Sequence, residues 1–173
     1  MQKKFVTNLV LLLSLNLIIK GFYILVIEVS VQNKVGTENF GTYFALLNFS
    51  MLMNILLDGG ITNFNNKNIS QNVHLLTKHF SSILVLKFFL AIIYLSISLI
   101  IGLIIGYDVR LMKLFLYLGF NQFLISFVLY LRSNLAGLHH FKTDSVMSVL
   151  DRSFMIIIAS LLLWSSWAPE KLD

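Results

Sequence analysis

Long apolar stretches separated by short polar segments dominate this chain of 173 residues. A helix needs about 20 apolar residues to cross the hydrocarbon layer of a bilayer. The stretches are continuous rather than alternating, which favours helices over a barrel. The sequence therefore predicts an all-α, polytopic transmembrane helix bundle that forms one domain. About five spans are expected, at residues 5–31, 40–64, 80–106, 111–131 and 146–167.

The polar segment between the second and third spans carries its own pattern. Ile69, Val73, Leu76 and Phe80 recur at steps of four, three and four, which places them on one face of a helix. A short helix over residues 65–80, lying on the cytoplasmic surface, would satisfy this pattern. An ordinary polar loop remains the alternative.

Composition supports a membrane location. Hydrophobic residues make up 57% of the chain and charged residues only 12%, about half the charged share of a soluble domain. The net charge of +5 comes from scattered rather than clustered basic residues, so no nucleic-acid partner is expected. The chain has no cysteine, which excludes disulfides, thiol catalysis and cysteine-ligated metal.

The basic residues predict the orientation, because cytoplasmic loops carry an excess of lysine and arginine. With the N-terminus in the cytoplasm, the inner side holds seven of them and the outer side four. The inner set is Lys3, Lys4, Lys67, Lys78, Arg132, Lys142 and Arg152, and the outer set is Lys34, Arg110, Lys113 and Lys171.

Four ionisable residues fall inside the expected spans: Lys20, Glu28, Asp58 and Lys87. A charge at the bilayer centre is costly, so each needs a partner, a wet cavity or an interface. Asp58 lies about 9 Å and Lys87 about 10 Å from the inner ends of their spans, at 1.5 Å per residue. Equal depth on consecutive helices predicts a structural Asp58–Lys87 ion pair, while Glu28 is expected near the outer interface.

Lys20 lies about 22 Å from the inner end of the first span, near the middle of the bilayer. Two explanations stay open: it pairs with a helix outside this chain, or it lines a watery cavity and attracts an anionic substrate. Gly59 and Gly60 directly follow Asp58. They are expected to serve either close helix packing or a hinge.

Two stretches resemble bacterial polysaccharide flippases, the Wzx-like transporters of O-antigen and capsule repeat units. The segment "VGTENFGTYFALLNFSMLMNILLDGGITNFNNKNIS" is similar to their first outer turn, second span and following inner loop, and "LRSNLAGLHHFKTDSVMSVLDR" to the inner connection between spans four and five. The matching residues of the first stretch are Gly36, Glu38, Phe40, Gly41, Tyr43, Asp58, Gly59, Gly60 and Lys67. Those of the second are Arg132, Gly137, Phe141, Asp144, Asp151 and Arg152, with Arg132, Asp144, Asp151 and Arg152 expected as inner-loop charges.

The resemblance implies membership of the multidrug/oligosaccharidyl-lipid/polysaccharide exporter superfamily, whose members resemble two helix bundles around a cavity that opens alternately to each side. It implies translocation of undecaprenyl-pyrophosphate-linked sugar repeat units across the bacterial inner membrane, with the chain as part of an N-terminal lobe. The expected partners are the lipid-linked oligosaccharide and membrane lipids, with no cofactor, no metal and no catalytic residue. Members usually have more than twice as many spans, so the chain is expected to be truncated and to require further spans or a partner chain.

Other functions remain as alternatives. A cation-coupled multidrug exporter of the same superfamily would use buried acids, whereas the midplane charge here is positive. A membrane acyltransferase would use the His139/Asp144 pair, whose spacing is that of a histidine base oriented by an acid. A passive assembly subunit is the third possibility.

Overall fold

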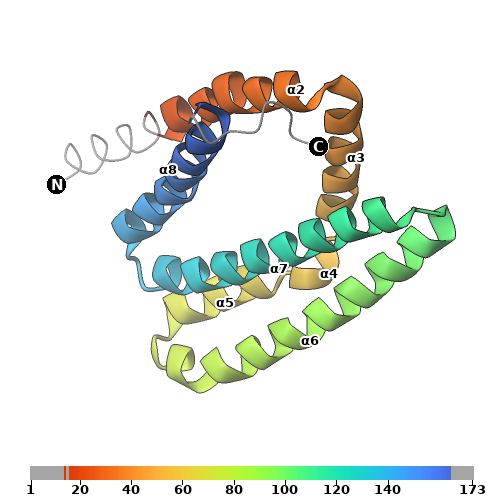
Figure 1. Ribbon diagram of the computed structural model, residues 1–173. Helices are drawn as coiled ribbons and strands as arrows, with labels where there is room; N and C mark the ends of the chain where they lie inside the picture. Colours follow the sequence, from red (N-terminus) through yellow and green to blue (C-terminus); the bar gives the residue numbers. More distant parts are fainter. Residues whose placement is uncertain (1–13, 15, 165–173) are drawn as a thin grey trace. The chain divides into compact units, whose positions relative to one another are not determined.

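A computed structural model describes residue 14 and residues 16–164 of the chain, and all regular secondary structure in this part is helical. Residues 16–22 are helical and lead into a π-helix. The elements are then η1 (Tyr23–Glu28), α2 (Val29–Val35), α3 (Thr37–Leu52), α4 (Ile55–Asp58), α5 (Ile61–Gln71), α6 (His74–Ile105), α7 (Val109–Gly137) and α8 (Phe141–Trp164), as shown in Figure 1.

The chain divides into two compact units. Unit 1 combines Met1–Phe40 with Lys142–Asp173, and unit 2 is the continuous segment Gly41–Phe141. Unit 2 holds α4 to α7 and most of α3, and it contains the candidate site.

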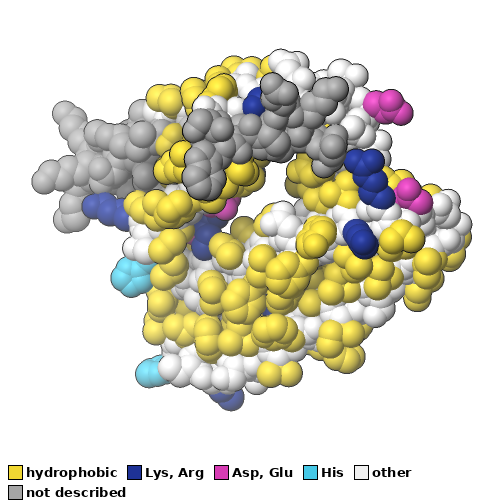
Figure 2. Space-filling model, in the orientation of Figure 1, with side chains coloured by type: hydrophobic (Ala, Val, Ile, Leu, Met, Phe, Trp, Pro, Cys, Tyr) yellow, Lys and Arg dark blue, Asp and Glu magenta, His cyan; other side chains and the backbone are white. Residues whose placement is uncertain are grey.

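Among the described residues, four helical segments are long and apolar enough to cross a membrane. They are Thr37–Asp58, His74–Ile105, Val109–Gly137 and Phe141–Trp164. Hydrophobic side chains cover much of the surface of α6 and α7 in Figure 2, and Ile92, Leu103 and Ile104 on α6 are 64%, 68% and 79% exposed. An apolar exterior of this size fits a lipid environment, because soluble proteins rarely expose such continuous patches.

The expected span boundaries need correction at one end of three helices. α6 begins before residue 80, α7 continues beyond residue 131, and α8 begins before residue 146. All three extensions are polar turns at helix ends that the sequence places on the inner side. These turns lack proline, so the helices continue past their apolar parts. Residues 5–13 and 15 of the first expected span lie outside the described residues, and residues 16–31 of it are helical.

The second expected span, residues 40–64, is a broken helix. α3 ends at Leu52, and a turn leads into the single turn of α4. Gly59 and Gly60 then separate α4 from α5, with φ angles of 51° and 85° in the left-handed region. A β-carbon at either glycine would meet nothing within 4 Å among the described residues. Within this part of the chain these glycines therefore permit a change of chain direction rather than close packing.

The prediction of a single helix over residues 65–80 is wrong. α5 ends at Gln71 because Asn72 takes an extended conformation (φ −150°, ψ 97°), and α6 begins at His74. Ile69 is only 1% exposed and faces α7, where a β-carbon built on Gly137 would lie 2.8 Å from the Ile69 β-carbon. Ile69, the member of the stripe that lies in α5, is therefore covered by another helix of unit 2, whereas Val73 is 60% exposed.

Two hydrophobic clusters hold unit 2 together. Leu46 of α3 packs with Phe115 and Leu118 of α7, and Leu57 of α4 packs with Ala91 and Tyr94 of α6. α5 lies along the second half of α7, and α6 contacts both α4 and α7. α4 and α5 of the broken helix thus pack against α6 and α7, the two longest helices among the described residues.

Within unit 1, side-chain contacts link α8 to η1 and α2. The Arg152 guanidinium lies 5.1 Å from the ring centroid of Tyr23, a cation–π contact. Lys34 Nζ donates a hydrogen bond of 2.6 Å to the carbonyl oxygen of Leu163, which satisfies one of the free carbonyls at the end of α8.

Candidate functional site: a buried ion pair at the helix break

Asp58 is the last residue of α4 and lies directly before the two left-handed glycines. Its Oδ1 atom is 2.5 Å from Lys87 Nζ on α6. The Lys87 side chain is 1% exposed and the Asp58 side chain 29% exposed. The structure therefore brings together the two residues that the sequence predicts as an ion pair, with the lysine enclosed and the acid partly open.

Three oxygen atoms surround the Lys87 ammonium group. Besides Asp58, Lys87 Nζ donates to Ser126 Oγ of α7 at 2.8 Å and to the Leu57 carbonyl oxygen at 3.3 Å. An ammonium group has three protons to donate, so each has an acceptor. This arrangement links α4, α6 and α7 at one point and satisfies a charge that would otherwise be very costly to bury.

Asp58 also fixes the start of α5. Its carboxylate accepts hydrogen bonds from the Thr62 hydroxyl and from the Thr62 backbone N–H, the latter at 3.3 Å. Backbone N–H groups at the start of a helix have no partner within the helix, and a nearby negative charge is favourable there. Asp58 therefore bridges both sides of the break.

Further polar contacts extend from this pair along the broken helix. Ser50 Oγ lies 2.6 Å from Tyr94 Oη, and Asn54 Nδ2 donates to Gln122 Oε1 at 3.1 Å. Asn65 Nδ2 donates to Asn134 Oδ1 at 2.7 Å and to Ser133 Oγ at 3.0 Å. Together with the ion pair these contacts form what we call the polar seam. Its members are Ser50, Asn54, Asp58, Thr62, Asn65, Lys87, Tyr94, Gln122, Ser126, Ser133 and Asn134.

α7 contributes its polar face to the seam and its apolar face to the exterior. Gln122, Ser126 and Asn134 are at most 6% exposed, whereas Tyr117 and Phe120 are 75% and 54% exposed. In α7 the polar face is therefore buried and the apolar face exposed, the reverse of a helix in a soluble protein. Side chains three or four residues apart share a helix face, so this pattern can be recognised in the sequence. Because these residues are uncharged, they are not among the ionisable residues that the sequence places inside the spans.

One donor of the polar seam has no acceptor. Gln122 Nε2 is buried and makes no hydrogen bond within the part of the chain that the structure describes. Nearly all buried polar atoms have a partner in a protein or an ordered water.

Lys20 lies in the helical residues 16–22 of unit 1 and is exposed. The described acidic residues do not include an ion-pair partner for it. Glu28 ends the π-helix and is half-buried. Lys20 and the polar seam belong to different units, so each is considered as a separate feature.

The four predicted inner-loop charges lie in helices. Arg132 is in the last turns of α7, and Asp144, Asp151 and Arg152 are in α8, because α8 begins at Phe141. Asp151 Oδ2 is 4.0 Å from Arg152 Nε, an exposed pair that contributes little. The connecting turn itself is only residues 138–140.

His139 takes a left-handed conformation in that turn, with φ 60°. It is exposed, and its ring packs against Phe141 at a centroid distance of 5.6 Å. Groups of three or more potential metal-ligating side chains do not occur among the described residues.

Comparisons with known proteins add no family: no family model, curated protein or solved structure matches the chain.

Proposed function

We propose that this chain is a membrane-embedded part of a Wzx-like flippase, which moves undecaprenyl-pyrophosphate-linked sugar repeat units across the bacterial inner membrane. The proposal rests first on the resemblance of two stretches to that family. The structural observation that supports it best is the helix break at Gly59–Gly60, which Asp58 bridges through Thr62 while it pairs with Lys87 of α6. Transporters commonly build their working parts from discontinuous helices of this kind.

The left-handed glycines at the break make it the place where the chain can change direction. α4 is a single turn, and both glycines are free of neighbouring atoms at the β-carbon position. The ion pair then acts as the fixed point, because Lys87 holds α4 against α6 and α7. A change of helix direction at this break is the movement that we propose for transport.

Lys20 is the residue proposed to contact the cargo. A pyrophosphate carries negative charge through the membrane, and an exposed lysine at membrane depth would lower the cost of that passage. Lys87 is less suited to the task, since its ammonium group is enclosed and already has three acceptors.

The geometry around Asp58 gives little support to the alternative of a cation-coupled drug exporter. Such coupling requires an acid that can release its partner to bind an ion, and Asp58 is bound to both Lys87 and Thr62. The proposed acyltransferase pair draws no support from His139, whose ring packs against a phenylalanine in a turn.

The test compares the amount of lipid-linked oligosaccharide in the outer leaflet of host cells that carry the intact or altered gene. Deleting the gene is expected to leave these lipids in the inner leaflet. Lys20→Gln should reduce translocation about tenfold or more, as expected for one lost hydrogen bond to a charged group, and Lys20→Arg should retain most of it.

The matched control is Lys113→Gln, because Lys113 is an exposed lysine near the start of α7. Membrane levels of every variant are compared by immunoblot. Unchanged outer-leaflet oligosaccharide after gene deletion would contradict the proposed function, and full activity of Lys20→Gln would contradict the role of Lys20 alone.

A further inference from the structure

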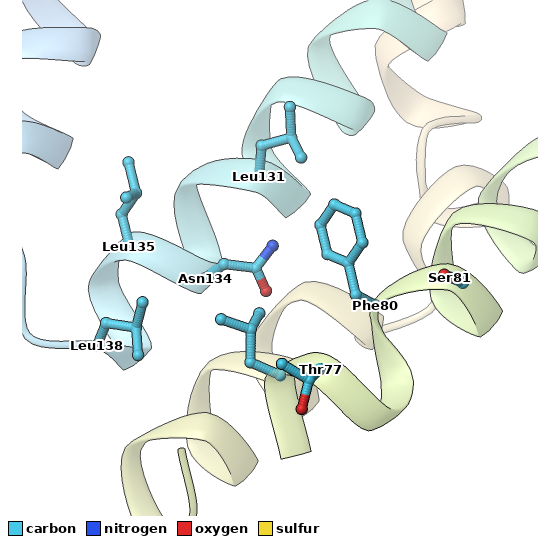
Figure 3. A pocket seen from close by; sticks show the side chains of 8 residues that line it. Thr77, Phe80, Ser81, Leu131, Asn134, Leu135 and Leu138 are labelled. Atoms are coloured by element: carbon cyan, nitrogen blue, oxygen red, sulfur yellow. The ribbon is translucent and has the colours of Figure 1, made fainter. Parts of the chain in front are cut away.

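A groove of 460 Å³ lies between the first turns of α6 and the last turns of α7, in unit 2 (Figure 3). Both walls are mainly apolar. The lining residues are Leu76, Thr77, Phe80, Ser81, Leu131, Asn134, Leu135 and Leu138.

Several polar groups of the groove are already hydrogen-bonded. Thr77 Oγ1 donates to the His74 carbonyl oxygen at 3.0 Å, the Phe80 carbonyl oxygen accepts from Tyr130 at 3.2 Å, and Asn134 Oδ1 accepts from Asn65. An apolar occupant would therefore displace little water that these groups need. The groove is chemically suited to a hydrocarbon chain.

The charges around this end of unit 2 have one sign. The only acidic residues between positions 41 and 141 are Asp58, which is paired with Lys87, and Asp108, at the opposite end of α7. The end that holds the groove carries Lys67, Lys78 and Arg132 together with all four histidines of the chain, His74, His79, His139 and His140. Figure 2 shows histidine side chains at this end.

The basic residues adjoin the groove along both helices. Lys78 is exposed and directly follows Thr77, and His74 lies one helical turn before Thr77. On α7, Leu138 is followed directly by His139 and His140, both exposed. An apolar groove therefore ends beside basic residues where the helices extend beyond their apolar parts.

We propose that this groove binds an anionic phospholipid of the bilayer. One acyl chain would lie along the leucine and phenylalanine side chains, and the phosphate group would contact Lys78 and the neighbouring imidazoles. Basic pockets between membrane helices bind anionic headgroups in this way. The proposal concerns a bound bilayer lipid and does not depend on the transported cargo.

The experiment is native mass spectrometry of the full chain, purified in detergent and mixed with phosphatidylglycerol or phosphatidylcholine of identical acyl chains. Phosphatidylglycerol should bind preferentially. Lys78→Gln should weaken its binding about fivefold, as expected for one cation near an anionic headgroup, while Lys113→Gln, at the other end of α7, should have no effect.

A second pair of variants tests the groove itself. Leu135→Trp fills the groove and should reduce phosphatidylglycerol binding, whereas Leu116→Trp, at an exposed position of the same helix, should not. Equal binding of the two lipids, or equal effects of Lys78→Gln and Lys113→Gln, would overturn the proposal. Displacement of phosphatidylglycerol by equimolar undecaprenyl pyrophosphate would also overturn the proposal, because it would assign the groove to the cargo. Loss of phosphatidylglycerol binding when the chain dimerises would overturn it as well, because it would assign the groove to a second copy of the chain.

Discussion

Lys87 and Asp58 show how a charge can be retained among apolar helices. The ammonium group is almost fully enclosed, but its three protons all meet oxygen acceptors. Removing one partner of a buried pair typically costs about 3–5 kcal/mol, because the remaining charge is left uncompensated. Removing one member of the pair is therefore expected to destabilise the protein more than removing both members.

The first prediction is a double-mutant cycle on this pair. Asp58→Asn and Lys87→Met should each destabilise the protein by about 3 kcal/mol or more, and the double variant should recover much of that loss because no charge remains buried. Thermal unfolding in detergent measures the four proteins. Additive losses in the double variant would show that the two residues do not interact.

The glycines of the break provide a second prediction. Gly60→Ala forces a β-carbon into the left-handed region (φ 85°), which should destabilise unit 2 by about 1–2 kcal/mol. Gly41→Ala is the matched control, since Gly41 lies within α3 and its β-carbon would also meet nothing within 4 Å. Unfolding midpoints of the two variants distinguish backbone strain from packing, and equal midpoints would contradict the assigned role of Gly60.

At the scale of elements, the contact of α5 with α7 depends on one glycine. A β-carbon at Gly137 would lie 2.8 Å from Ile69 Cβ and 3.1 Å from the Asn66 carbonyl oxygen, so the helices would have to separate. At Gly119 the nearest atom is the end of the flexible Leu95 side chain, at 3.1 Å. A backbone atom of the neighbouring helix therefore lies close to the β-carbon position at Gly137 but not at Gly119.

Gly137→Ala is therefore expected to destabilise the protein by about 1–3 kcal/mol, and Gly119→Ala by clearly less. The decrease in unfolding midpoint in detergent measures both. If Gly119→Ala were the more harmful of the two, the assigned close approach of α5 and α7 would be incorrect.

Element boundaries also show what the sequence could predict. Continuous apolar runs located α6, α7 and α8, because twenty or more apolar residues specify a membrane-length helix. The break after Asp58 was not predicted, since the surrounding residues remain apolar and the glycines had two explanations. The extended backbone at Asn72 was missed because the stripe from Ile69 to Phe80 keeps helical spacing across it.

The candidate site was predictable only in part. Charge and depth identified Asp58 and Lys87, since few other groups within the spans could compensate them. The uncharged members of the polar seam recur at helical spacing, but serine and asparagine also occur singly in membrane helices without a functional role. Which of them meet across helices depends on the rotation of each helix, which a single sequence does not specify.

At the scale of the whole molecule, the account requires that unit 2 crosses the bilayer with its two ends on opposite sides. The absence of cysteine from the chain allows single-cysteine labelling in intact cells with a membrane-impermeant maleimide. His74→Cys should react from one side only, Val109→Cys from the other side only, and Ile92→Cys, which is 64% exposed in the middle of α6, from neither side. Labelling of positions 74 and 109 from the same side, or reaction of position 92 with the impermeant reagent, would contradict the account.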